Sequence, residues 1–67
     1  MKPEISVVIP AYNEEESLHP LFESLYPVMK EMKRPFEIIF INDGSKDSTL
    51  GILYDLYLSN PEVRVID

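Results

Sequence analysis

Short, nearly continuous apolar runs alternate along the chain with longer segments of mixed polarity. The continuous apolar runs cover residues 5–9, which are rich in β-branched residues, and 36–41, and residues 62–67 form a third short segment. Runs of this kind are typical of strands buried on both faces of a parallel sheet. We therefore predict three strands at these positions, the first of them ended by Pro10.

In the first longer segment, apolar residues recur at steps of three and four, the spacing of one helix face. This predicts a helix from Leu18 to Lys33, capped by Ser17 and with Pro20 in its first turn, where a missing N–H costs little. Pro27 lies inside the segment and predicts a kink or break near Glu23–Pro27. The predicted apolar stripe consists of Leu18, Leu21, Phe22, Leu25, Val28, Met29 and Met32.

A second helix is predicted after residues 42–47, a cluster of turn-forming residues. Asp47 or Ser48 can cap this helix, and Asn60-Pro61 ends it. Its predicted core stripe consists of Leu50, Leu53, Tyr54, Tyr57 and Leu58.

The resulting order, β-α-β-α-β, predicts an α/β fold with parallel strands and right-handed crossovers. We expect three parallel strands in the order 3-2-1. The sheet should lack its cover on one face or one edge, as in a fragment of a larger domain.

Composition narrows the class of protein. The chain has 67 residues, no cysteine, one histidine and a net charge of −6. One small domain fits this length, and the acidic balance argues against nucleic-acid binding through phosphates. Disulfides, cysteine-ligated zinc and multi-histidine metal sites are excluded. With no signal peptide and no apolar run of about 20 residues, the chain is expected to be cytoplasmic.

Polar residues follow the first two predicted strands, at the sheet edge where parallel α/β folds bind ligands. Tyr12 offers a ring for stacking, while Glu14 and Asp43 offer carboxylates that accept hydrogen bonds from a base N–H or a ribose hydroxyl. No glycine-rich phosphate-binding motif is present, and Lys46 alone offsets the acidic residues of these loops. The pattern therefore favours a nucleoside over a phosphate.

Residues 5–15 together with residues 36–49 resemble the N-terminus of family 2 glycosyltransferases. The nearest branch transfers a sugar from a nucleotide to a polyprenyl phosphate, as dolichol-phosphate mannosyltransferases and undecaprenyl- or bactoprenol-phosphate glucosyltransferases do. The resemblance implies the Rossmann-like half of a glycosyltransferase A fold, with residues 1–67 as an incomplete nucleotide-binding domain. It also implies a role for Asp43 at the base, and for Glu14 at the ribose or in the pocket architecture. The implied nucleotide-binding residues are Pro10, Ala11, Tyr12, Glu14, Ile41 and Asp43.

The same resemblance implies inverting transfer of a hexose from a UDP- or GDP-sugar to a polyprenyl phosphate. Asn42 departs from the family pattern, because many members have a second Asp there. In members of the family, the metal-binding motif and the catalytic groups follow the part that residues 1–67 resemble. We therefore expect a divalent metal, Mg or Mn, held outside these residues, no catalytic or metal-binding residue within them, and no activity of the chain alone. The longer protein is expected to associate with the cytoplasmic face of a membrane.

Other interpretations compete with these roles. The segment at residues 42–45 is also a common turn sequence, Asp47 is expected to act as a helix cap, and His19 is expected to be a solvated first-turn residue. Glu15 and Glu16 match the positive end of a helix dipole. As a whole, the chain is alternatively a non-enzymatic module that self-associates through its open sheet edge. A receiver-like signalling domain fits less well, because no clear phospho-acceptor Asp with a downstream Lys is present.

Overall fold

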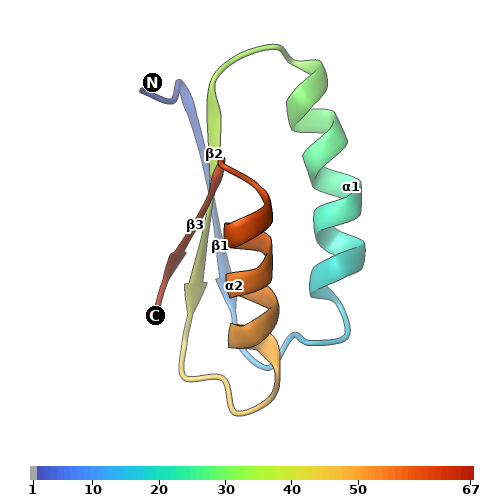
Figure 1. Ribbon diagram of the computed structural model, residues 1–67, viewed down its shortest axis with the longest axis vertical. Coiled ribbons are helices and arrows are strands. Elements are labelled where there is room, and N and C mark those ends of the chain that lie inside the picture. The colour runs from blue at the N-terminus through green and yellow to red at the C-terminus, as the bar shows by residue number, and fades with distance from the viewer. Residues whose placement is uncertain (1) are drawn as a thin grey trace.

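The computed structural model describes residues 2–67, which form a parallel sheet of three strands and two helices (Figure 1). The strand order is β1-β2-β3, which is the predicted order 3-2-1 counted from the other edge, so the predicted α/β fold is confirmed. In chain order the elements are β1 (Ile5–Ala11), α1 (Leu18–Glu31), β2 (Phe36–Asn42), α2 (Thr49–Ser59) and β3 (Val63–Ile66).

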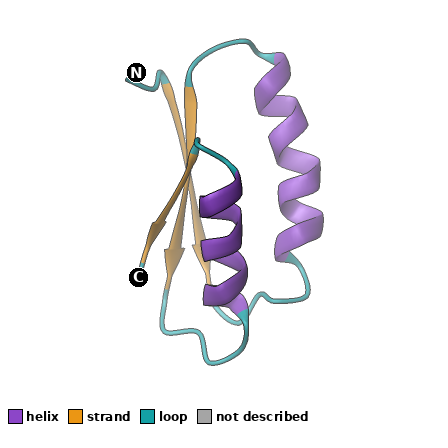
Figure 2. Cartoon of the chain, viewed as in Figure 1, coloured by secondary structure: helices purple, strands orange, loops and turns teal. Residues whose placement is uncertain are grey.

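Both helices lie on the same side of the sheet (Figure 2), as two successive right-handed crossovers require. Side chains on the helix side of β2 are buried, with Ile38 and Phe40 fully inaccessible to solvent. The opposite face is uncovered, and Val8 on that face is 55% exposed. The strands are therefore buried on the helix side alone, unlike strands of a sheet covered on both faces. This agrees with the prediction that the sheet lacks its cover on one face or one edge, because no element of residues 2–67 packs on the second face.

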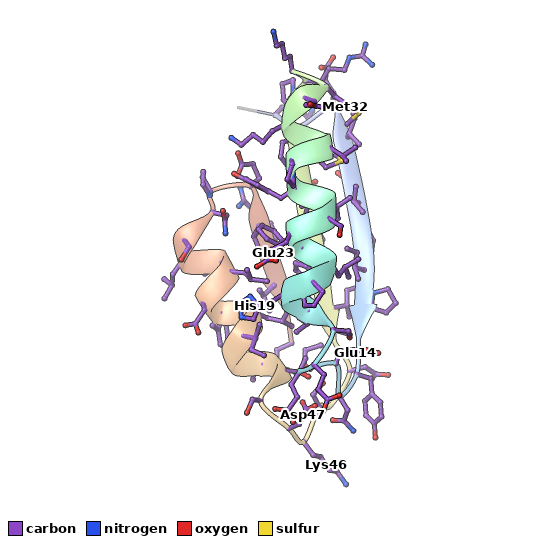
Figure 3. The ribbon with its side chains drawn as sticks, turned by 90° about the vertical axis from the view of Figure 1, so that its right-hand side faces the viewer. Glu14, His19, Glu23, Met32, Lys46 and Asp47 are labelled. Atoms are coloured by element: carbon purple, nitrogen blue, oxygen red, sulfur yellow. The ribbon has the colours of Figure 1, made fainter. Side chains whose placement is uncertain are left out.

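The helix α1 runs without a break through Pro27, so the predicted break near Glu23–Pro27 does not occur (Figure 3). Both residues are exposed, so the carbonyl group that loses its partner faces water. The helix ends earlier than predicted, and Lys33 takes a left-handed φ of 53° just beyond it. Of the predicted apolar stripe, Leu18, Phe22 and Met29 are buried.

The core stripe of α2 differs from the predicted one. Thr49, Leu53 and Leu56 are buried, whereas Tyr54 and Tyr57 are 45% and 47% exposed. The helix carries apolar residues nearly all round, so their spacing alone did not determine which face meets the sheet.

The strand β1 also differs from its prediction, because it continues through Pro10 to Ala11. Pro10 has no N–H to donate, and it is tolerated here because β1 is an edge strand within residues 2–67. The extension matters for the site, since it carries the ladder to the last residue before Tyr12.

Candidate functional site

Two loops meet at the carboxyl end of the sheet, the end to which the strand arrows point in Figure 1. The ladder pairs Pro10 with Ile41 and Ala11 with Asn42. One further hydrogen bond, from the backbone N–H of Asp43 to the carbonyl of Ala11 at 3.0 Å, continues the pairing beyond the strands. Tyr12 and Asp43 therefore leave neighbouring strands side by side, as the sequence predicted.

The side chains of Tyr12 and Asp43 are available at this edge. Tyr12 is 54% exposed, Asp43 is exposed as well, and neither side chain makes a hydrogen bond within residues 2–67. Ala11 lies buried beneath them, Pro10 is exposed and Ile41 is half-buried. The structure thus brings together five of the six predicted nucleotide-binding residues around one edge, with an aromatic ring and a carboxylate free to meet a ligand.

Glu14, the sixth, is turned toward its own loop. Its carboxylate accepts a hydrogen bond of 2.8 Å from the hydroxyl of Ser17. Ser17 stands at the N-cap position of α1 as predicted, but its hydroxyl makes no capping bond to the helix. Of the two roles predicted for Glu14, this contact fits a part in the loop architecture.

Side chains that the sequence analysis did not select hold the two loops together. The backbone N–H of Asn13 donates to the hydroxyl of Ser45 at 3.0 Å, and the N–H of Lys46 donates back to the Asn13 side-chain oxygen at 2.8 Å. Next to them, the N–H of Glu14 donates to the Thr49 hydroxyl at 2.7 Å. We call Asn13, Ser45, Asp47 and Thr49 the loop clasp.

Within the loop clasp, Asp47, labelled in Figure 3, connects the loop after β1 to the start of α2. Its carboxylate accepts from the N–H of Thr49 at 2.9 Å and from the N–H of Glu15 at 3.4 Å. Hydrogen bonds from Thr49, its side chain first, lower the pKa of Asp47 below its ordinary value. The prediction of Asp47 as a cap is thereby confirmed, while Ser48 occupies the N-cap position without a side-chain capping bond. The spacing Asp47-x-Thr49 was the available sequence signal for the clasp.

Asn42 lies at the end of β2 on the side of the sheet that the helices cover, and it is only 6% exposed. Its amide nitrogen donates to the Asp67 carboxylate at 2.7 Å. Its side-chain oxygen has no partner within residues 2–67. Asn42 thus connects the ends of β2 and β3 under the loops.

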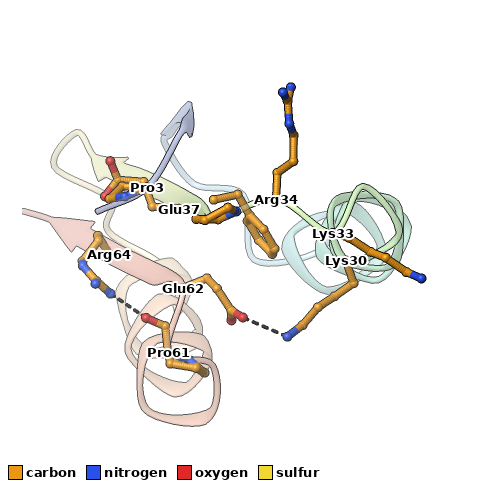
Figure 4. A pocket seen from close by; sticks show the side chains of 10 residues that line it. Pro3, Lys30, Lys33, Arg34, Glu37, Pro61, Glu62 and Arg64 are labelled. Atoms are coloured by element: carbon orange, nitrogen blue, oxygen red, sulfur yellow. Dashed lines mark hydrogen bonds and ion pairs between the residues drawn. The ribbon is translucent and has the colours of Figure 1, made fainter. Parts of the chain in front are cut away.

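A separate cavity of about 690 Å³ opens at the amino end of the sheet (Figure 4). Basic side chains line it, but Lys30 is paired with Glu62 at 2.9 Å and Arg64 donates to the carbonyl of Pro61 at 2.7 Å. In Figure 4, Lys33 and Arg34 point outward and away from Glu62. The cations therefore do not converge on a common point, and the cavity does not form an anion site.

Comparison with known proteins identifies the family. The model of a family described as glycosyl transferase family 2 matches residues 6–67. The chain belongs to this family. An uncharacterized glycosyltransferase of Synechocystis is 48% identical over 64 residues, which cover 96% of this chain and 20% of that protein.

Two further family relatives have names that specify a reaction. An undecaprenyl-phosphate 4-deoxy-4-formamido-L-arabinose transferase of Pectobacterium carotovorum is 44% identical, over 92% of this chain and 19% of that protein. A bactoprenol glucosyl transferase of Shigella phage SfX is 48% identical, over 88% of this chain and 19% of that protein. The chain spans about a fifth of the length of these curated relatives.

The acidic side chains of residues 2–67 are not arranged to hold a metal ion. No group of three or more His, Asp or Glu side chains within residues 2–67 is placed to hold a metal ion. The carboxylates of the loops do not supply a cage, so no step here is assigned to a metal. Likewise, neither helix of the described residues is long and apolar enough to cross a membrane.

Proposed function

We propose that this chain forms the donor-binding part of an inverting glycosyltransferase that transfers a hexose from a UDP- or GDP-sugar to a polyprenyl phosphate. The observation that carries the proposal is the pairing of β1 with β2 up to Ala11 and Asn42. Because of this register, Tyr12 and Asp43 leave neighbouring strands side by side at the ligand-binding edge of a parallel sheet, and each has a free side chain.

The chemistry of these two side chains favours particular bases. An ionised carboxylate accepts hydrogen bonds and donates none. Asp43 therefore suits the imide N–H of uracil, or the N1–H and amino group of guanine, while the Tyr12 ring stacks on the base. In contrast, the acidic loops repel a bare diphosphate. The diphosphate of the donor consequently needs a cation, and we place its ligands in parts of the longer protein outside this chain.

The acceptor is proposed from the relatives. Two of them are named for undecaprenyl phosphate and bactoprenol, and both match most of this chain. We propose that a polyprenyl phosphate is also the acceptor of the longer protein that contains this chain. That protein would then work at the cytoplasmic face of a membrane. The chain by itself supplies donor binding and no catalytic group, so it is expected to be inactive alone.

A titration of the ¹⁵N-labelled chain with UDP and then GDP tests the proposal. Amide signals of Tyr12, Glu14 and Asp43 should shift, and Asp43→Asn should weaken binding about tenfold or more, because it removes a charged acceptor. Asp55→Asn is the matched control, since Asp55 is an exposed residue of α2 and loses the same charge. The proposal is contradicted if millimolar UDP and GDP shift no amide signals, both in the folded chain and in a chain extended past Asp67.

Self-association through the open sheet edge is a second proposal, favoured by the unpaired outer strands and by the uncovered sheet face beside them. Val8 and Ile66 on that face are 55% and 54% exposed, and the outer edges of β1 and β3 are unpaired within residues 2–67. Sedimentation analysis should then show a dimer that forms with increasing concentration and is weakened by Val8→Lys. A chain that stays monomeric at millimolar concentration contradicts this proposal and leaves the first untouched.

A further inference from the structure

We propose that the loop clasp positions the nucleoside site, with Thr49 as its central residue; this inference rests on the proposed function. Asn13, Ser45, Asp47 and Thr49 need no contact with the ligand for this role. They fix the backbone from which Tyr12 and Asp43 project.

Thr49 connects the loop after β1 to a rigid helix. It is fully buried at the first position of α2, and its hydroxyl accepts the Glu14 N–H at 2.7 Å. Leu53 and Leu56 anchor the same helix in the core. A loop bonded to Thr49 is therefore bonded indirectly to the hydrophobic core, although Glu14 itself is exposed.

Asn13 supplies the second connection. It has a left-handed φ of 50°, and in this conformation its N–H and its side-chain oxygen both bond to the loop after β2. Tyr12 consequently lies between Ala11, which the sheet holds, and Asn13, which the clasp holds. Asp43 lies in the same way between Asn42 and Ser45.

The clasp thus orders the backbone on both sides of each proposed ligand-contacting residue and leaves their side chains free. A site ordered before the ligand arrives avoids the entropy loss of ordering two loops on binding. Without the clasp, the one remaining backbone bond between the loops is that from Asp43 to Ala11. Weakened nucleotide binding is therefore the expected consequence of breaking the clasp.

Thr49→Val tests this inference because it replaces the hydroxyl by a methyl group of similar size and so removes the acceptor of the Glu14 N–H. Nucleotide binding should weaken about tenfold, the amide of Glu14 should exchange faster, and the signals of Tyr12 and Asp43 should move in the free chain. Thr49→Ser, which keeps the hydroxyl, should restore binding. Ser48→Ala is the matched control, because the Ser48 side chain makes no capping bond.

A second variant separates positioning from stability. Asn13→Gly keeps access to the left-handed backbone and removes the acceptor for Lys46, so it should weaken nucleotide binding without unfolding the chain. The inference is overturned if wild type binds nucleotide and Thr49→Val exposes the Glu14 amide yet binds equally well. In that case the proposed function stands. If neither the wild-type chain nor the chain extended past Asp67 binds nucleotide, the proposed function fails, and this inference fails with it.

Discussion

The two ends of the sheet are both joined by hydrogen bonds between distant segments, but the groups that form those bonds differ. At the carboxyl end, backbone N–H groups of Asn13, Glu14 and Lys46 donate to side-chain oxygens. At the amino end, side chains bond to side chains, and Glu62 accepts from Tyr26 at 2.9 Å while it pairs with Lys30 at 2.9 Å. The loops after β1 and β2 are therefore joined mainly through backbone N–H groups, beside the side-chain bond from Asn42 to Asp67. The Tyr26–Glu62–Lys30 cluster is joined through side chains, beside the backbone bonds that Pro35 accepts at the same end.

This difference explains why one end is suited to bind a ligand. Where the backbone carries the connections, the side chains of Tyr12 and Asp43 remain free in the described structure. Where side chains carry them, the charges satisfy one another, and the large cavity beside Lys30 and Glu62 offers no converging group. The cavity at the amino end is thus the poorer candidate for a binding site.

Among the substitutions that compare the two ends of the sheet, Glu62→Ala should have the largest effect on stability. It removes the acceptor of the Tyr26 hydroxyl, whose ring stacks on Phe22 at 4.9 Å and meets Phe36 edge-on at 6.0 Å. The free energy of unfolding should fall by about 1–2 kcal/mol, because a hydrogen bond to a charged group is lost and the hydroxyl must find water. Urea titration measures this loss, and nucleotide affinity should stay unchanged.

Glu31→Ala is the control for this substitution. Glu31 is exposed at the end of α1, and its removal should change the free energy of unfolding by less than about 0.5 kcal/mol. If Glu62→Ala weakened nucleotide binding as much as Thr49→Val does, the two ends would not be independent, and the comparison would fail.

Much of the fold could be predicted from local pattern. The three short segments gave the strands, and turn residues with helical spacing gave the helices between them. Burial could not be predicted in the same way, because α2 carries apolar side chains nearly all round. Only the packing of α2 on the sheet determines that Leu56 is buried and Tyr54 is exposed. The uncovered face likewise left Val8 exposed in a run that reads as fully buried.

The candidate site likewise contains residues whose positions could be predicted from the sequence and contacts that could not. Tyr12 and Asp43 could be placed side by side because each directly follows a strand of a parallel pair. The bond from Glu14 to Thr49 spans 35 positions in the sequence, and it forms only once α2 is seated on the sheet. The bond from Tyr26 to Glu62 spans 36 positions and depends on the same packing. Contacts of this kind have no local sequence signature.

A pH series should sharpen the comparison with a smaller effect. Hydrogen bonds from Thr49 lower the pKa of Asp47 below its ordinary value of 3.8. Burial raises the pKa of Glu62, but the hydrogen bonds from Lys30 and Tyr26 outweigh burial, so this pKa lies below its ordinary value of 4.5. Both carboxylates therefore stabilise the fold above these ordinary values, and the stabilisation is lost as pH falls through the lowered pKa values. Acid should weaken both ends of the sheet.

Alkali should weaken the amino end alone. The hydrogen bond to Glu62 raises the pKa of Lys30 above its ordinary 10.5, and burial raises the pKa of Tyr26 above its ordinary 10.0. Both groups therefore stabilise the fold below their ordinary pKa values, and this stabilisation is lost as the pH rises through their raised pKa values. Urea titrations across pH should show Asp47→Asn reducing the acid dependence only, because no group of the clasp titrates in alkali. Glu62→Gln should reduce both limbs, since Glu62 loses its own titration and Lys30 loses its charged partner. An alkaline limb that Glu62→Gln leaves unchanged would show that the loss does not depend on the bonds of Glu62 and arises from the burial of Tyr26 or from other groups.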